Sequence, residues 1–192
     1  MAGELDGITV AILASDMVEE AELTEPRQAM ERAGASTILI APAKREIISA
    51  NHFEQSNSYP VDITFDKDDV REEDFDAVFL PGGALNADFL RTNAQAQKFV
   101  QDIDKSGKPL AVICHAPWLL VSAGLVKGRH LTSFSTIADD IRNAGGRWSD
   151  EAVVRDDNWV SSRQPDDIPE FNKAVVGLFT TGARTRKLQP VL

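Results

Sequence analysis

The chain has 192 residues, 43% of them hydrophobic and 26% charged, which is typical of one globular domain and not of a disordered protein. Its formal net charge of −10 comes without a basic stripe, so nucleic acid and anionic membrane surfaces are disfavoured as partners. The N-terminal segment has no basic region and its apolar run is only strand-length, so we expect no signal peptide, no membrane span and a cytoplasmic protein.

Strands and helices are predicted to alternate along the chain. The first strand is the continuous apolar run Ile8–Ala14, which is followed by an acidic helical stretch over Glu19–Ala33. Further strands are predicted at Ser36–Ala41, Asp76–Leu80 and Leu110–Ile113, with a helix at Ala94–Lys105. This alternation predicts an α/β fold with a doubly wound, mostly parallel sheet, in which ligands bind at the carboxyl ends of the strands.

Two antiparallel pairs are predicted in addition. The first is a short antiparallel excursion from the main sheet, formed by Arg45–Ser49 and Val61–Phe65. The second is a late hairpin, formed by Ala152–Asp156 and Trp159–Ser162.

The C-terminal part is predicted to be helical. A final helix is expected from near Asp166 to about Thr181, and a loosely held tail over 183–192. No repeat, linker or low-complexity block divides the chain. We therefore expect a single domain over residues 1–192, with its core at about 6–182.

The only cysteine of the chain lies where a buried strand turns into a helix. Cys114 directly follows an apolar strand, and Ala116 and Pro117 open the next helix. Such a nucleophile elbow presents the side chain at the end of the strand and directs helix N-terminal amides at it, which stabilises a thiolate and a developing oxyanion. We therefore expect Cys114 to be a nucleophile with a depressed pKa. The alternative is a buried, inert thiol.

His115 follows the cysteine directly and needs an orienting partner to act as a base. No carboxylate lies close to it in sequence, so an ordinary first-turn histidine is the alternative.

The acidic loop after the first strand is a second expected influence on the sulfur. Glu19 and Glu22 share one helix face, and we expect the first strand and the elbow strand to be neighbours, so that their carboxyl ends meet. A protonated carboxyl there donates a hydrogen bond to a thiolate. The alternative is a solvated helix N-terminus.

Gly82 and Gly83 end another strand and allow backbone amides to approach a ligand oxygen, as in an oxyanion hole. A plain turn is the alternative.

Six ordered segments resemble the DJ-1/PfpI superfamily, and most closely its PfpI branch of intracellular protease I and general stress proteins. They are Val18–Leu23, Phe79–Gly83, Gly107–Trp118, Ser122–Ser133, Ile141–Trp148 and Asn158–Phe171. The resemblance covers about residues 6–182.

This resemblance implies a flavodoxin-like sandwich that forms homodimers or hexamers. It implies that Cys114 is the nucleophile, that Glu19 hydrogen-bonds its sulfur and that His115 is the neighbouring imidazole. The amides of Gly83 and His115 are expected at the oxyanion, and Gly82 and Trp118 also at the substrate site. Asp88 corresponds to a glutamate that reaches the histidine from the adjacent subunit. The stretch around it departs from the family pattern, because it carries Asp and its loop differs in length by one residue.

The resemblance implies three kinds of activity. The first is chemistry on reactive dicarbonyls, as a glyoxalase or deglycase, without cofactor or metal. The second is cysteine peptidase activity, and the third is a non-enzymatic role as an oxidative-stress sensor or chaperone in which Cys114 is oxidised. Glutamine amidotransferases also have an elbow cysteine, but they need a later histidine, and this chain has none after His130.

Overall fold

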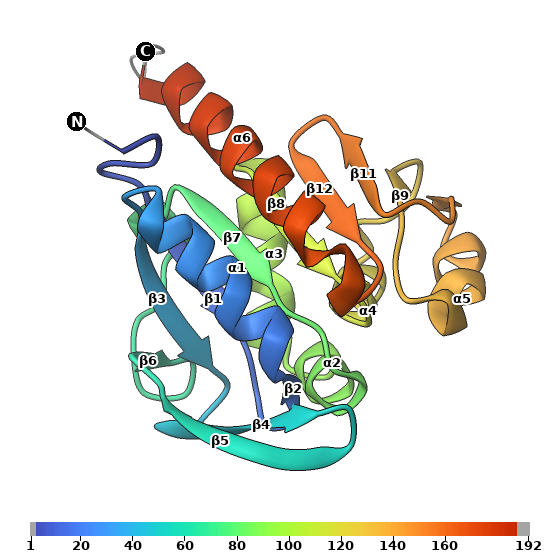
Figure 1. Cartoon of the computed structure of the whole chain (residues 1–192), viewed down its shortest axis with the longest axis horizontal. Coiled ribbons are helices and arrows are strands. Elements are labelled where there is room, and N and C mark those ends of the chain that lie inside the picture. Colours follow the sequence, from blue (N-terminus) through green and yellow to red (C-terminus); the bar gives the residue numbers. More distant parts are fainter. Residues whose placement is uncertain (1–2, 188–192) are drawn as a thin grey trace.

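A seven-stranded sheet forms the centre of the computed structural model, which describes residues 3–187 (Figure 1). Its strand order is β11-β12-β8-β7-β1-β3-β6, and every pair is parallel except β11 with β12. The strands are β1 (Thr9–Leu13), β3 (Ser36–Ala41), β6 (Ile63–Thr64), β7 (Ala77–Leu80), β8 (Leu110–Ile113), β11 (Val153–Asp156) and β12 (Trp159–Ser162). The predicted doubly wound, mostly parallel sheet and the late hairpin are confirmed.

Helices cover both faces of the sheet, which explains why the central strands are continuously apolar. In Figure 1, α1 (Glu20–Arg32) and α6 (Ile168–Lys187) lie in front of the sheet. The helices α3 (Ala94–Lys105) and α4 (Pro117–Ser122) pack on the opposite face. Together the two layers bury every residue of β7 and β8.

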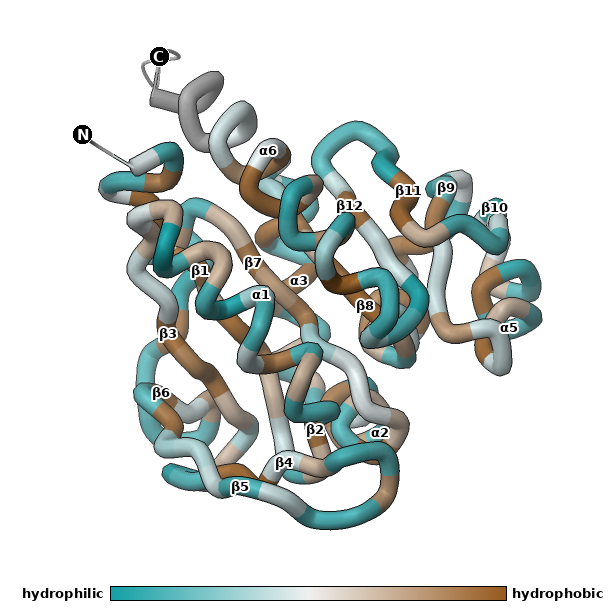
Figure 2. The backbone as a smooth tube through the Cα atoms, in the orientation of Figure 1, coloured by the Kyte–Doolittle hydropathy of each residue, from teal (hydrophilic) through white to brown (hydrophobic). Residues whose placement is uncertain are grey.

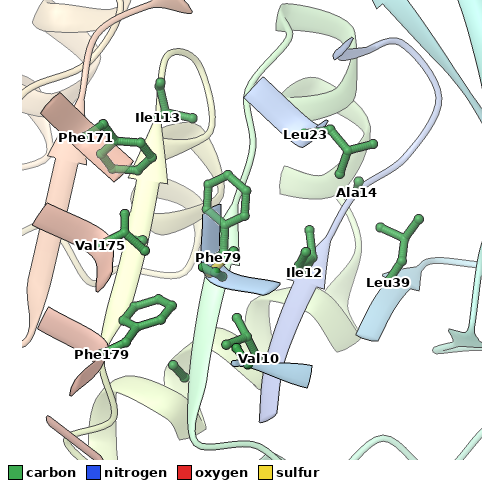
Figure 3. Close-up of a cluster of buried hydrophobic side chains, with 14 of the residues drawn as sticks. Val10, Ile12, Ala14, Leu23, Leu39, Phe79, Ile113, Phe171, Val175 and Phe179 are labelled. Atoms are coloured by element: carbon green, nitrogen blue, oxygen red, sulfur yellow. The ribbon is translucent and has the colours of Figure 1, made fainter. Parts of the chain in front are cut away.

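The core on the α1 and α6 side is shown in Figure 3. Alternate residues of β1, such as Val10 and Ile12, point to this side. Helix α6 contributes Phe171, Val175 and Phe179, whose spacing of four residues places them on one helix face.

Two small sheets flank the main one. The first contains β2 (Val18–Glu19), β4 (Glu46–Asn51) and β5 (Glu54–Pro60) in the order β2-β4-β5. The second pairs β9 (His130–Leu131) with β10 (Arg147–Trp148). Figure 2 shows hydrophobic residues along the central strands and hydrophilic residues along β5.

The predicted antiparallel excursion has a different partner from the one expected. Strand β4 pairs with β5, and Ile63–Thr64 instead joins the main sheet in parallel to β3. Strand β5 lies at a sheet edge with most of its residues exposed, so its sequence carries no apolar alternation that would have indicated a strand.

Three further expectations are corrected. Strands β1 and β8 are not neighbours, because β7 lies between them in the sheet and pairs with both. The stretch around Asp88, expected to be a loop, is the helix α2 (Ala84–Arg91). The final helix begins at Ile168, after the 3₁₀ turn Pro165–Asp167, and continues to Lys187, so the expected tail is helical over 183–187 and only 188–192 lie outside the described residues.

The remaining elements are short and lie in the connections. They are the 3₁₀ turns Glu72–Asp74 and Ser135–Ile137, and the helix α5 (Ala138–Asn143).

Candidate active site

The elbow geometry predicted for Cys114 is present. The residue follows β8 with a φ of 62°, a left-handed conformation that is uncommon outside glycine, and Pro117 occupies the first turn of α4. Two backbone hydrogen bonds hold this conformation: the Cys114 amide donates to Ser162 O at 3.1 Å, and its carbonyl accepts from Phe134 N at 2.9 Å. The strained backbone is thus determined by its surroundings, a pattern that clusters at functional sites.

His115 lies beside the sulfur and is held by groups of the same chain. Its Nδ1 is 3.1 Å from Cys114 Sγ, and its Nε2 is 3.3 Å from Thr136 Oγ1. The ring stacks on Phe134 and meets the edge of Trp118. Burial lowers the pKa of His115, so its imidazole is neutral at physiological pH and able to accept a proton. Within one subunit the orienting group is therefore the hydroxyl of Thr136, which the sequence did not indicate.

The carboxyl group at the sulfur belongs to Glu22, and the assignment of this contact to Glu19 was wrong. Glu22 is completely buried, its carboxyl interacts with the Cys114 side chain, and its Oε2 accepts a hydrogen bond from Gly82 N at 3.0 Å. Glu19 immediately precedes α1, and its Oε2 instead accepts from His52 N at 2.9 Å. The physical reason is that Glu19 is the last residue of β2 and has an extended backbone, so it does not share the helix face of Glu22. Glu22 in the first turn of α1 reaches Gly82, whereas Glu19 reaches the β4–β5 hairpin.

Glu22 and Cys114 form a coupled acid pair. Burial, followed by the charge of Glu19, raises the pKa of Glu22 from 4.5 to about 8, so this carboxyl is protonated at neutral pH. Burial also raises the pKa of the Cys114 thiol, and the negative charge of an ionised Glu22 raises it further. The expectation of a depressed Cys114 pKa is therefore wrong. The thiol is 7% exposed, and its desolvation outweighs the stabilising effect of the nearby amides.

Those amides are the ones expected at the oxyanion. The backbone N–H groups of Gly83 and His115 hydrogen-bond the Cys114 side chain and favour its charged form. Gly82 leaves no room for a side chain, because a Cβ there would lie 2.3 Å from Glu22 Oε2 and 2.6 Å from Cys114 Cβ. Gly83 has a φ of 93°, which favours glycine. The structure therefore requires glycine at both positions for reasons beyond those of a plain turn.

In this chain, neither Asp88 nor Trp118 hydrogen-bonds the sulfur. Asp88 is exposed on α2, while the hydrogen-bonding partners of His115 in its own chain are Cys114 and Thr136. A contribution of Asp88 to a second subunit's histidine stays a prediction. Trp118 is half-buried, and its indole N–H donates to Asp140 at 2.9 Å.

Within residues 3–187, no group of three or more His, Cys, Asp and Glu side chains could hold a metal ion. None of the helices in the described part of the chain combines the length and apolar character needed to cross a membrane.

The comparisons with known proteins agree with this geometry. The model described as the DJ-1/PfpI family matches residues 8–178. The deglycase TK1284 of Thermococcus kodakarensis is 39% identical over 169 residues, which cover 88% of this chain and 98% of that protein. “Putative cysteine protease YraA” of Bacillus subtilis is 34% identical, over 88% of this chain and 96% of that protein. A crystal structure from Anabaena variabilis, with DJ-1/ThiJ/PfpI-like and ferritin-like domains, superposes with a TM-score of 0.82 and 32% identity, covering 88% of this chain and 47% of that one.

Proposed function

This chain belongs to the DJ-1/PfpI family, and we propose that it is a cytoplasmic, cofactor-free cysteine enzyme that acts on reactive dicarbonyls as a glyoxalase or deglycase. The observation that carries the proposal is the set of functional groups that surround one sulfur. A neutral imidazole lies 3.1 Å from Cys114 Sγ, a protonated carboxyl interacts with the Cys114 side chain, and two backbone amides face it. The deglycase name of a relative that matches almost over its full length supports the same chemistry.

The first proposed step is addition of the sulfur to the aldehyde carbon of a methylglyoxal-like compound. His115 Nδ1 takes the thiol proton as the S–C bond forms, and the electron pair of the C=O double bond moves to the oxygen. The amides of Gly83 and His115 stabilise the negative oxygen. The imidazolium then returns its proton to that oxygen, which leaves a neutral hemithioacetal.

The second proposed step converts the hemithioacetal into an acid. The proton on the former aldehyde carbon is moved by His115 to the ketone carbon, and a hydroxyl proton moves from the first oxygen to the second, which yields the thioester of a 2-hydroxy acid. Water then adds to the thioester carbon, the C–S bond breaks, and the thiol regains a proton. The net reaction consumes one dicarbonyl and one water and produces one 2-hydroxy acid. For a deglycase, sulfur instead replaces an amine on this carbon, and the amine leaves with a proton.

Glu22 supports both steps as a neutral hydrogen-bond donor. A carboxyl group with a pKa of about 8 keeps its proton at neutral pH and places no charge beside the sulfur during attack. In this proposal Glu22 has the role that the sequence interpretation assigned to Glu19.

The experiment is a panel of assays on the purified protein and its Cys114→Ser variant. The protein is incubated separately with methylglyoxal, with an amine previously reacted with methylglyoxal, with casein, and with peroxide followed by mass spectrometry. We expect a 2-hydroxy acid from the first two substrates, and none from Cys114→Ser. Oxidation of Cys114 without turnover of any carbonyl substrate would instead indicate a redox sensor and contradict the proposal.

A cysteine peptidase is the second candidate, favoured by the Cys114–His115 contact and by the relative named as a cysteine protease. Attack on an amide uses the same sulfur, but the leaving amine must be protonated by an oriented acid. Because Asp88 is exposed on α2, it is available to reach His115 of a second copy in a homodimer or hexamer. Casein cleavage that requires Asp88 would support this candidate.

A further inference from the structure

The two amides that serve the site belong to successive peptide units between β7 and α2. Gly82 N–H donates to Glu22 Oε2 at 3.0 Å, and Gly83 N–H faces Cys114. Neither residue has a side chain, so rotation of these peptide units meets little intrinsic resistance. Something outside the two glycines must hold both N–H groups toward the sulfur and the carboxyl.

Asn86 contacts the opposite ends of the same two peptide units. Its Nδ2 donates to Pro81 O at 3.0 Å and to Gly82 O at 2.9 Å. Its Oδ1 accepts from Ser15 N at 2.7 Å, in the loop that follows β1. The side chain is completely buried, and both the oxygen and the nitrogen of its carboxamide are used in these contacts.

The geometry of the peptide bond links these contacts to the site. In a planar trans peptide, the C=O and the N–H point in opposite directions. The Pro81 carbonyl belongs to the peptide unit that carries Gly82 N–H, and the Gly82 carbonyl belongs to the unit that carries Gly83 N–H. By holding the two carbonyls on one side, Asn86 directs the two N–H groups to the other side, toward Glu22 and Cys114.

We propose that Asn86 is a positioning residue that fixes the orientation of the Gly82 and Gly83 amides at the nucleophile. It touches neither the sulfur nor a substrate, and it acts through two peptide planes. Its place in the first turn of α2 gives the carboxamide a rigid base, and the bond to Ser15 N fixes which side of the carboxamide donates. The inference rests on the proposed role of Cys114 as nucleophile, but its test does not require turnover.

The test measures the reactivity of the only cysteine in the chain. Wild type, Asn86→Ala and Asn86→Ser are alkylated with iodoacetamide over a range of pH, and thiolate absorbance near 240 nm is recorded in parallel. Both variants lose the carboxamide donor to Pro81 O and Gly82 O, and Gly82 O keeps only the longer bond from Glu19 N at 3.2 Å. We expect the midpoint of the pH profile to rise and the alkylation rate at fixed pH to fall about tenfold, as for loss of a hydrogen bond to a charged group. If the dicarbonyl assay is positive in wild type, kcat should fall about 10²-fold with KM little changed.

Asn93→Ala is the matched control. Asn93 caps α3 by accepting a hydrogen bond from Ala96 N at 2.8 Å, and its side chain makes no hydrogen bond to Gly82 or Gly83. Loss of this cap lowers the stability of the protein without rotating the Gly82 or Gly83 peptide units. The alkylation profile of Asn93→Ala should therefore coincide with that of wild type.

The outcomes separate the two proposals. A raised midpoint in folded Asn86→Ala or Asn86→Ser, with Asn93→Ala unchanged, supports the inference even if no dicarbonyl is turned over. A wild-type alkylation profile in a folded Asn86 variant would overturn it. If Asn86→Ala does not fold, Asn86→Ser decides, and a folded protein is verified by circular dichroism before each titration.

Discussion

Replacing Glu22 by Gln should make the protein more stable at neutral pH, although it removes a group from the candidate site. The glutamine is nearly isosteric, and its carbonyl oxygen can still accept the hydrogen bond from Gly82 N. Unlike the acid, it never ionises. In the unfolded chain Glu22 ionises near its usual value of 4.5, whereas burial raises its pKa in the folded protein to about 8.

The direction in which stability changes with pH follows from proton binding. Because the folded state holds the proton more tightly, wild-type stability is greatest below the unfolded pKa, declines as pH rises from about 4.5 to about 8, and then levels off. Each pH unit in this window corresponds to about 1.4 kcal/mol. At pH 7 the buried carboxyl therefore costs about 3 kcal/mol relative to a side chain that cannot ionise.

The assay is urea denaturation of wild type and Glu22→Gln at several pH values between 5 and 8. The difference in free energy of unfolding should be small at the acidic end and increase toward pH 8 in favour of the variant. Glu19→Gln is the matched control from the same start of α1. Since the charge of Glu19 raises the folded pKa of Glu22, the decline in this control should still begin near pH 4.5 but end at a lower pH than in wild type, with a smaller total loss of stability.

A second measurement on the same variant examines the sulfur. An ionised Glu22 raises the pKa of Cys114, so Glu22→Gln should increase the alkylation rate of Cys114 above pH 8. A stability difference that stays constant from pH 5 to 8 would refute the reasoning, because it would mean that Glu22 is already ionised in the folded protein.

Three other predictions concern the same site. In the wild type, alkylation of Cys114 should show a midpoint above the free value of ~8.5, because burial raises its pKa; a lower midpoint would contradict the desolvation argument. Gly82→Ala should lower both the melting temperature and turnover, because its Cβ would lie 2.3 Å from Glu22 Oε2, and unchanged melting and activity would disprove the close fit. Asp88→Ala should leave dicarbonyl turnover intact but reduce any peptidase activity ~10²-fold by removing the orientation of His115, whereas a monomer in light scattering or equal loss of both activities would exclude the intersubunit role.

Much of the architecture was determined locally and could be predicted from the sequence. The apolar runs of β3 and β8 and the helix α3 were predicted with the bounds that the structure has, because buried parallel strands and amphipathic helices carry a strong hydrophobic pattern. The elbow at Cys114 was also predictable, since an apolar strand followed by Pro117 leaves only a short turn for the cysteine. The exposed edge strand β5 was missed because its mostly polar residues carry no such pattern.

The identity of the carboxyl at the sulfur was decided only by tertiary structure. Glu19 and Glu22 are chemically identical and three residues apart, so no local pattern separates them. Both are buried, and which of them contacts the sulfur depends on where α1 begins and on β7 lying between β1 and β8, which brings Gly82 over Glu22. The ionisation of Cys114 was misjudged for a related reason. Sequence indicates the amides that favour a thiolate, but the desolvation that opposes it arises only when strands and helices distant in the chain close around the sulfur.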